Sequence, residues 1–188
     1  MRDLSLHLMD IIQNSVAAGA GHIVISLQAE PETGNFIMMV EDNGSGMDGA
    51  LLAIVTDPFT TTRTTRKTGL GIPLLKVAAE RASGGLQITS FKGCGTIIKA
   101  SFGILNIDRP PLGDIADTIT GVILANPETD LKLVLQRDGE VFEMDTMEIK
   151  ARLLEVSITE YEVLKWIREY VNEGIIAIFG GVLDEIHS

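Results

Sequence analysis

Two polar residues near the start of the chain have the spacing of a divalent-cation site. Asp10 and Asn14 are four residues apart in a stretch with helical periodicity, so both side chains would project from one helix face, about 6 Å apart. Mg²⁺ prefers hard oxygen ligands in an octahedron, and an asparagine carbonyl with phosphate oxygens and waters supplies them. The alternative is an ordinary surface asparagine near a helix end.

A second motif, Glu-Asp-Asn-Gly-Ser-Gly-Met at residues 41–47, directly follows a predicted strand. Gly44 and Gly46 would let the backbone come close to a flat ligand, because glycine carries no side chain. The Asp42 carboxylate offers an acceptor for an exocyclic amine such as that of adenine. The alternative is a simple Asx turn, in which the Asp42 side chain bonds its own backbone.

A third motif, residues 57–71, combines hydroxyl groups and cations with a Gly-Leu-Gly that opens a predicted helix. Free backbone N–H groups and the positive end of the helix dipole at Gly69 and Gly71 would form an anion site. The alternative is a solvated loop. The cations that would add to the anion site are Arg63, Arg66 and Lys67.

The elements that must position these motifs alternate between helix and strand. Apolar residues at helical spacing predict helices over 3–18 and 70–82, and period-2 alternation predicts strands over 22–28 and 35–40. The turn Gly93-Cys94-Gly95-Thr96 leads into the last of two further strands, 86–91 and 96–102. This pattern predicts an α/β (α+β) sandwich, with a mixed, mostly antiparallel sheet covered by helices on one face.

Charge divides the chain into two unequal parts. Residues 1–104 carry a net charge of −1, whereas residues 105–188 carry seventeen acidic and seven basic side chains, a net of −10. Such an acidic second part argues against nucleic acid as a partner, because its phosphates require Lys and Arg. A Pro pair and a glycine at 108–113 mark the boundary. We therefore predict a domain at 1–104, a linker at 105–111 and an acidic α+β region at 112–188 for partner binding or dimerisation.

The same composition predicts a cytoplasmic protein. The only cysteine is Cys94, so no internal disulfide is possible. No apolar run approaches the roughly 20 residues of a membrane helix, and Asp10 and Gln13 interrupt the region where the apolar core of a signal peptide would lie.

The acidic region itself shows weaker patterns. Helices are expected over 112–125, from Asp145 through Leu154, and from Thr159 to near Gly174. A strand over 131–135 and the hairpin turn Asp138-Gly139 lead to a second strand. The apolar run 174–183 is expected to be a strand packed on that hairpin, the alternative being a partner surface. We expect a core position for Leu164, Trp166 and Tyr170.

Taken together and in order, the motifs of residues 1–104 resemble the GHKL superfamily of ATP-binding domains, named for gyrase, the heat-shock chaperone, histidine kinase and MutL. Residues 13–20 are similar to the N box of the family, and residues 41–47 to its G1 box. Asp57-Pro58-Phe59 resembles the F box of histidine kinases, and residues 68–71 their G2 box. The resemblance implies a Bergerat-type ATP-binding fold that takes ATP with Mg²⁺.

The resemblance also implies roles for individual residues. Asn14 would ligate Mg²⁺, and Asp42 would accept from the adenine amine with help from the hydroxyl group of Thr96. Residues 60–68 would form a short lid over the nucleotide, and Gly69 and Gly71 would present backbone amides to its phosphates. The full nucleotide-binding set that the motifs imply is Asn14, Asp42, Gly44, Gly46, Met47, Phe59, Thr62, Arg63, Arg66, Lys67, Thr68, Gly69, Leu70, Gly71 and Thr96.

Departures from the family pattern limit the chemistry. Hydrolysing members carry a glutamate as general base where this chain has the shorter Asp10, and a displacement of order 1 Å can cost about 10²-fold in rate. We therefore expect slow hydrolysis at best. Ala17 replaces an aspartate of MutL-like members, which would remove one water-mediated contact to the base. His7, one turn before Asp10, is a poor substitute for the phosphorylated histidine of histidine kinases.

Three functions stay open. The chain begins at the N-box helix, so we expect any phosphoryl acceptor on a partner in trans, as for the anti-sigma-factor serine kinases that the layout resembles. The chain also resembles small GHKL proteins with an acidic tail that are encoded near iron hydrogenase subunits, which implies a hydrogenase-linked partner as another possibility. The alternatives to a protein kinase of the serine or histidine type are a non-catalytic ATP-operated switch and a weak ATPase that cycles a homodimer.

Overall fold

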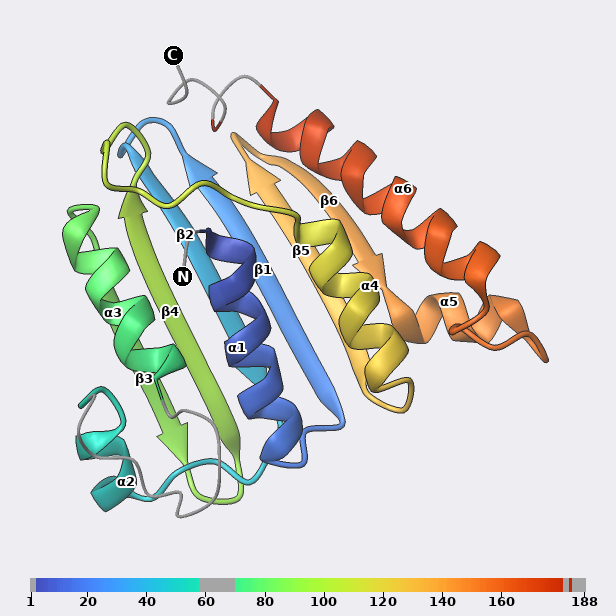
Figure 1. Ribbon diagram of the computed structural model, residues 1–188, viewed down its shortest axis with the longest axis horizontal. Coiled ribbons are helices and arrows are strands. Elements are labelled where there is room, and N and C mark those ends of the chain that lie inside the picture. Colours follow the sequence, from blue (N-terminus) through green and yellow to red (C-terminus); the bar gives the residue numbers. More distant parts are fainter. Residues whose placement is uncertain (1–2, 58–69, 181–182, 184–188) are drawn as a thin grey trace.

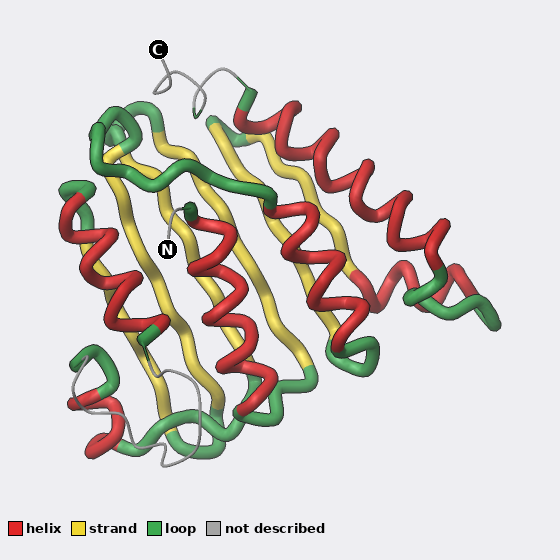
Figure 2. Tube along the Cα trace, in the orientation of Figure 1, coloured by secondary structure: helices red, strands yellow, loops and turns green. Residues whose placement is uncertain are grey.

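The fold is one six-stranded sheet with helices packed on one of its faces (Figures 1 and 2). The computed structural model describes residues 3–57, 70–180 and 183. Within them the strand order is β3-β4-β2-β1-β5-β6, and every neighbouring pair is antiparallel except β1 and β5. The predicted fold class is thereby confirmed. The strands are β1 (His22–Glu30), β2 (Asn35–Asp42), β3 (Gly85–Phe91), β4 (Gly95–Gly103), β5 (Asp130–Arg137) and β6 (Glu140–Asp145).

Four of the helices lie side by side over the sheet in the order α3, α1, α4, α6 (Figure 1). Asp3 begins α1 by accepting a hydrogen bond from the Leu6 amide at 3.0 Å, and Asp114 caps α4 through the Asp117 amide. The short helices α2 and α5 lie beyond the ends of the strands. The helices are α1 (Leu4–Ala17), α2 (Gly49–Ile54), α3 (Gly71–Arg81), α4 (Ile115–Ala125), α5 (Thr146–Leu153) and α6 (Tyr161–Phe179).

The core fills the space between the sheet and these helices. Alternate residues of β1, from Ile23 to Ala29, point into it, because side chains of a strand alternate between its two faces. Leu4, Leu8 and Ile11 of α1 meet them from the helix layer and are almost completely buried. Burial of each such side chain contributes about 1.5–3 kcal/mol, so α1 is held firmly against the middle of the sheet.

The acidic region completes this sheet. β5 lies parallel to β1, with Leu133 opposite Ile25, and β6 forms the edge beyond it. Between β4 and α4 the chain crosses over one end of the sheet, where the buried Arg109 donates to the carbonyls of Ile104 at 3.0 Å and Leu183 at 3.1 Å. The pairing of β5 with β1 thus joins the acidic region and the first part of the chain in one sheet.

Three expectations for the acidic region are wrong. Residues 174–179 continue α6 and do not form a strand, and α6 does not end near Gly174. Gly174 is required inside the helix, because a Cβ there would lie 2.7 Å from the Phe142 ring. Val171 and Ile178 share its buried face, one turn away on either side. Trp166 is also not a core residue, since 49% of its surface is exposed.

Candidate functional site

A row of polar side chains crosses the helix-facing side of the sheet at one end. Ser90 of β3 pairs with Thr96 of β4, and Thr96 pairs with Asp42 of β2. Further along the same strands the helix-facing positions are apolar, as at Ile98 and Val40. A polar row beneath a helix layer has to be hydrogen-bonded within the protein or used by a ligand, so this end of the sheet is the candidate site.

Asp42 is the most constrained member of the row. Its residue is only 9% exposed. Its Oδ2 accepts a hydrogen bond from the Ser15 hydroxyl of α1 at 2.7 Å, and its Oδ1 accepts from the Gly44 amide at 2.8 Å. Each carboxylate oxygen has a second lone pair. The carboxylate is therefore held between α1 and the turn after β2 with acceptor capacity left for a ligand donor.

Ser90 joins Thr96 to the turn that follows β2. The Ser90 Oγ accepts from the Met47 amide at 2.8 Å, donates to the Gly95 carbonyl at 3.0 Å and lies 2.8 Å from the Thr96 Oγ1. In the Ser90–Thr96 pair either hydroxyl can be the donor. Sequence reasoning missed Ser90, although a polar residue in phase with the inward-facing Leu86 and Ile88 is a signal that could have found it.

Close backbone packing explains two glycines beside Asp42. Gly95 has φ +95°, and a Cβ there would overlap the Asp42 carbonyl oxygen. Gly46 has φ +62°, and a Cβ there would overlap the Phe91 carbonyl oxygen. Glycine is therefore required at both positions by the packing of the protein's own backbone. Gly44 is also confined, with a Cβ position 3.0 Å from Ala18.

Asn43 links the same turn to the beginning of β1. Its Oδ1 accepts from the amides of Gly21 and His22, each at 2.9 Å, while the Ser45 amide donates to the Ala18 carbonyl at 2.9 Å. The carbonyl of Gly21 in turn accepts from the amide of Asp130, the first residue of β5. The turn after β2 is thus fastened to both α1 and the strand that begins the acidic half of the sheet.

Asp10 and Gly71 come together between α1 and α3. A Cβ on Gly71 would lie 3.0 Å from the Asp10 Cβ and 3.2 Å from its Oδ2. The Asp10 carboxyl therefore lies at the first turn of α3, whose N-cap residue Leu70 makes no side-chain capping bond. Burial raises the pKa of Asp10, so the folded chain disfavours its ionised form and loses stability as pH rises through that pKa.

Some of the remaining predicted residues lie in the described part of the chain and others lie outside it. Asn14 is exposed near the end of α1, next to Ser15, and Leu70 is 36% exposed at the start of α3. His7 is buried, its Nδ1 lacks a partner among the described residues, and burial lowers its pKa. The predicted residues that lie outside the described residues are Phe59, Thr62, Arg63, Arg66, Lys67, Thr68 and Gly69.

Comparison with known families agrees with this geometry. The family described as histidine kinase-, DNA gyrase B- and HSP90-like ATPase matches residues 2–105, which hold the polar row, α1 and the start of α3. The chain belongs to this family. Its first part is therefore a GHKL ATP-binding domain, as the motifs predicted. In the described part of this ATPase-family chain no helix is long and apolar enough to span a membrane.

Individual relatives of this ATPase-family chain are distant. A Shewanella frigidimarina (strain NCIMB 400) protein whose name describes it as a sensor protein is 33% identical over 103 residues, which are 54% of this chain and 16% of the relative. The crystal structure of the N-terminal domain of a DNA repair protein superposes with a TM-score of 0.58 at 17% identity, covering 78% of this chain and 53% of that one. The ADP-bound ATPase domain of Aquifex aeolicus MutL gives a TM-score of 0.45 at 13% identity, covering 81% and 68%.

Proposed function

We propose that this chain is a Mg²⁺-dependent ATP-binding signalling module that acts on a separate protein, by phosphoryl transfer in the manner of a protein kinase. The observation that carries the proposal is the polar row Ser90-Thr96-Asp42, with the Asp42 carboxylate fixed by Ser15 and Gly44. A family of ATP-binding proteins matches the same residues. The kinase role rests on two points. One relative is named a sensor protein, and Asp10 is shorter than the glutamate with which the family hydrolyses ATP, so we expect slow hydrolysis.

The donor and acceptor pattern of this row fits adenine. Each Asp42 carboxylate oxygen accepts one hydrogen bond from the protein, and its remaining lone pairs can only accept. The exocyclic amine of adenine is a donor and complements them, whereas the carbonyl of guanine at the equivalent position would face a negative acceptor. We therefore expect the pocket to prefer ATP over GTP, because a buried polar group left unpaired is costly.

Residues at the other end of the pocket fit a triphosphate with its cation. Among the described residues the N-cap Leu70 gives the first-turn amides of α3 no side-chain capping bond, and these amides, beginning at Gly71, would bind phosphate oxygens. Asn14 is exposed on α1 and would give Mg²⁺ an amide oxygen. Among the described residues no cluster of three or more His, Cys, Asp or Glu could hold a metal, so the other ligands would be phosphate and water. When bound, Mg²⁺ would neutralise phosphate charge.

Turnover of ATP by the chain alone tests this assignment. Asp10 is shorter than the glutamate that the family uses as general base, and it is packed against Gly71 and therefore cannot readily advance. We expect phosphate release slower than about 0.1 s⁻¹, about 10²-fold below a typical enzyme, with Asp10→Asn within about threefold of wild type. The measurement is release and transfer of radiolabelled γ-phosphate.

Different outcomes separate the candidate functions. Label that moves to a protein added in trans supports the kinase. Rapid release that Asp10→Asn abolishes would contradict the proposal and make Asp10 a true general base. Neither transfer nor release, together with tight ATP binding, would favour an ATP-operated switch. Two hydrogen bonds favour this second candidate. The Gly21 amide donates to Asn43 and the Gly21 carbonyl accepts from the Asp130 amide, so Gly21 links the turn after β2 to the start of β5.

A further inference from the structure

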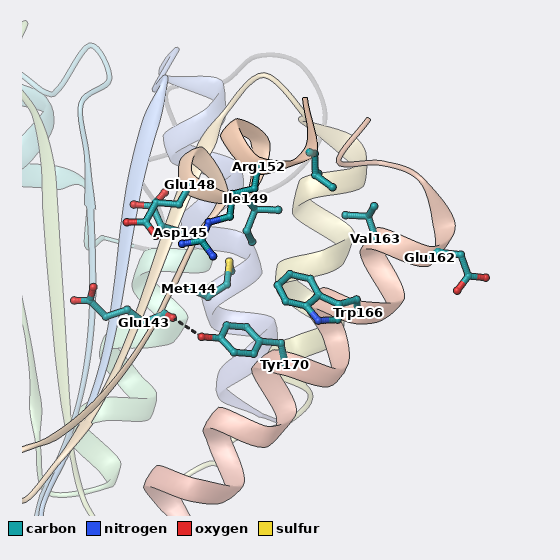
Figure 3. Close-up of a pocket in the computed structure, with 11 residues that line it drawn as sticks. Glu143, Met144, Asp145, Glu148, Ile149, Arg152, Glu162, Val163, Trp166 and Tyr170 are labelled. Carbon is teal, nitrogen blue, oxygen red and sulfur yellow. Dashed lines mark hydrogen bonds between the residues drawn. The ribbon is translucent and has the colours of Figure 1, made fainter. Parts of the chain in front are cut away.

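A groove of about 600 Å³ lies at the opposite end of the sheet from β3, between β6, α5 and α6 (Figure 3). Apolar side chains line it, with Ile149 and Leu153 from α5 and Val163 from α6. Its volume falls in the range of roughly 300–1,000 Å³ that binding sites occupy. The groove shares no lining residue with the nucleotide pocket, and no motif of the first hundred residues accounts for it.

Two stacked aromatic rings form the centre of the groove. The Trp166 and Tyr170 ring centroids lie 5.3 Å apart with their planes at 7°, and the Phe142 ring packs against Tyr170 with centroids 4.7 Å apart. The Tyr170 hydroxyl donates to the Glu143 carbonyl of edge strand β6 at 3.3 Å, as Figure 3 shows. Trp166 is nevertheless half exposed. An ordered, exposed tryptophan face is a favourable surface for a cation or an apolar group.

Carboxylates outnumber cations among the residues that line the groove, although Figure 3 shows the Glu143, Asp145 and Glu148 carboxylates pointing away from the two rings. Glu143, Asp145, Glu148 and Glu162 line the groove against one basic residue, Arg152. In Figure 3, Asp145 and Glu148 lie at the α5 end beside Arg152, and Glu162 points outward from the far rim. Lys132 pairs with Glu143 at 3.0 Å and also interacts electrostatically with Asp145 and Glu148, so four carboxylates face two cations, Lys132 and Arg152. The groove therefore keeps a negative surplus, within a half of the chain whose net charge is −10.

Exposed apolar side chains continue beyond the groove. They lie from α5 to the first turn of α6, a stretch that Figure 1 shows at one end of the molecule. The exposed residues of this stretch are Met147, Leu154, Val156 and Tyr161.

We propose that this groove binds a basic segment of the partner protein, with a Lys or Arg side chain over Trp166 and neighbouring apolar side chains on Val163 and Ile149. The inference rests on the proposed function only in requiring a protein partner. The negative charge of the groove distinguishes between two possible occupants, a second copy of this chain and a basic segment of another protein. A second copy of the same surface would bring two negative rims together, whereas a basic segment offsets the negative surplus and is steered toward it.

The experiment uses the full chain without nucleotide, so its failure is distinguishable from failure of the ATP proposal. Trp166 is the only tryptophan, and its fluorescence therefore reports directly on the groove. The probes are dodecapeptides that alternate Arg and Leu, their Glu-Leu counterparts, and Arg-Ser peptides. We expect the Arg-Leu peptide alone to shift the emission, with saturation below about 1 mM. No shift with it, or an equal shift with Arg-Ser, would overturn the proposal.

Charge reversals at matched positions give the second arm, followed by anisotropy of a labelled Arg-Leu peptide. Glu148→Lys should weaken binding about fivefold, and Arg152→Glu should strengthen it by a similar factor. Glu169→Lys is the control, because Glu169 is an exposed residue of α6 outside the groove and makes the same change in net charge. Equal weakening by Glu148→Lys and Glu169→Lys would show general attraction to an acidic protein and would overturn the assignment to the groove.

Discussion

Replacing Asp42 by asparagine is expected to weaken ATP binding by about 100-fold. The amide nitrogen of an asparagine can only donate, so the new side chain could not accept from both the Ser15 hydroxyl and the Gly44 amide, as Asp42 does at 2.7 and 2.8 Å. It would also turn a donor toward the adenine amine, or lose an existing partner. Hydrogen bonds to charged groups contribute about 1.5–3 kcal/mol, which corresponds to roughly 10–150-fold in affinity.

A neighbouring carboxylate provides the control for this substitution. Glu41 precedes Asp42 in β2, is exposed on the other face of the sheet, and also carries a carboxylate. Glu41→Gln should leave ATP affinity unchanged. Both variants, Glu41→Gln and Asp42→Asn, should still unfold in a cooperative thermal transition. The measurement is calorimetric titration with ATP alongside thermal unfolding. Binding by Asp42→Asn within about threefold of wild type would show that Asp42 does not contact the base.

Gly95→Ala is expected to lower the free energy of unfolding by about 3–4 kcal/mol. Gly95 has φ +95°, a conformation that costs a residue with a side chain about 1–3 kcal/mol. The new Cβ would in addition overlap the Asp42 carbonyl oxygen. β2 and β4 would have to separate at the end of the sheet that holds the polar row. We therefore expect ATP binding to be lost even in the molecules that remain folded.

The same hairpin contains a matched glycine. Gly93 has φ +82°, but a Cβ on it would meet nothing within 4 Å. Gly93→Ala therefore adds the backbone strain without the overlap and should cost about 1 kcal/mol. Urea denaturation of the two variants measures the difference. Similar losses in both would mean that strain alone, and not the approach to Asp42, requires glycine at position 95.

Local patterns predicted the elements of the first part well, because each one has a clear physical signal. Period-2 alternation in β1 places Ile23 and Ile25 in the core, and helical spacing does the same for Leu8 in α1. The order of motifs also indicated that Thr96 lies near Asp42. Sequence reasoning gave Gly46 a ligand-binding role, which stays a prediction, and it did not reveal that a Cβ there would meet the backbone of Phe91. Such long-range contacts leave no local trace.

The acidic half was harder to predict for a related reason. The run 174–183 is apolar almost throughout, so it carries neither a period of 2 nor one of 3.6 and is compatible with a strand or a helix. In the structure this run continues α6 to Phe179, and Gly174 packs against the Phe142 ring of β6. That packing is a tertiary contact. Parallel pairing of β5 with β1 likewise joins segments more than a hundred residues apart, which local patterns do not reveal.

The central claim is that α1, the polar row and the start of α3 form one Mg²⁺-dependent ATP pocket. Its most direct test is calorimetric titration of ATP, with and without Mg²⁺, into wild type and Asn14→Ala. We predict that Mg²⁺ tightens binding to wild type at least about tenfold and that Asn14→Ala removes most of this gain. Equal affinity with and without Mg²⁺ in both proteins, or no binding of ATP to wild type, would contradict the account.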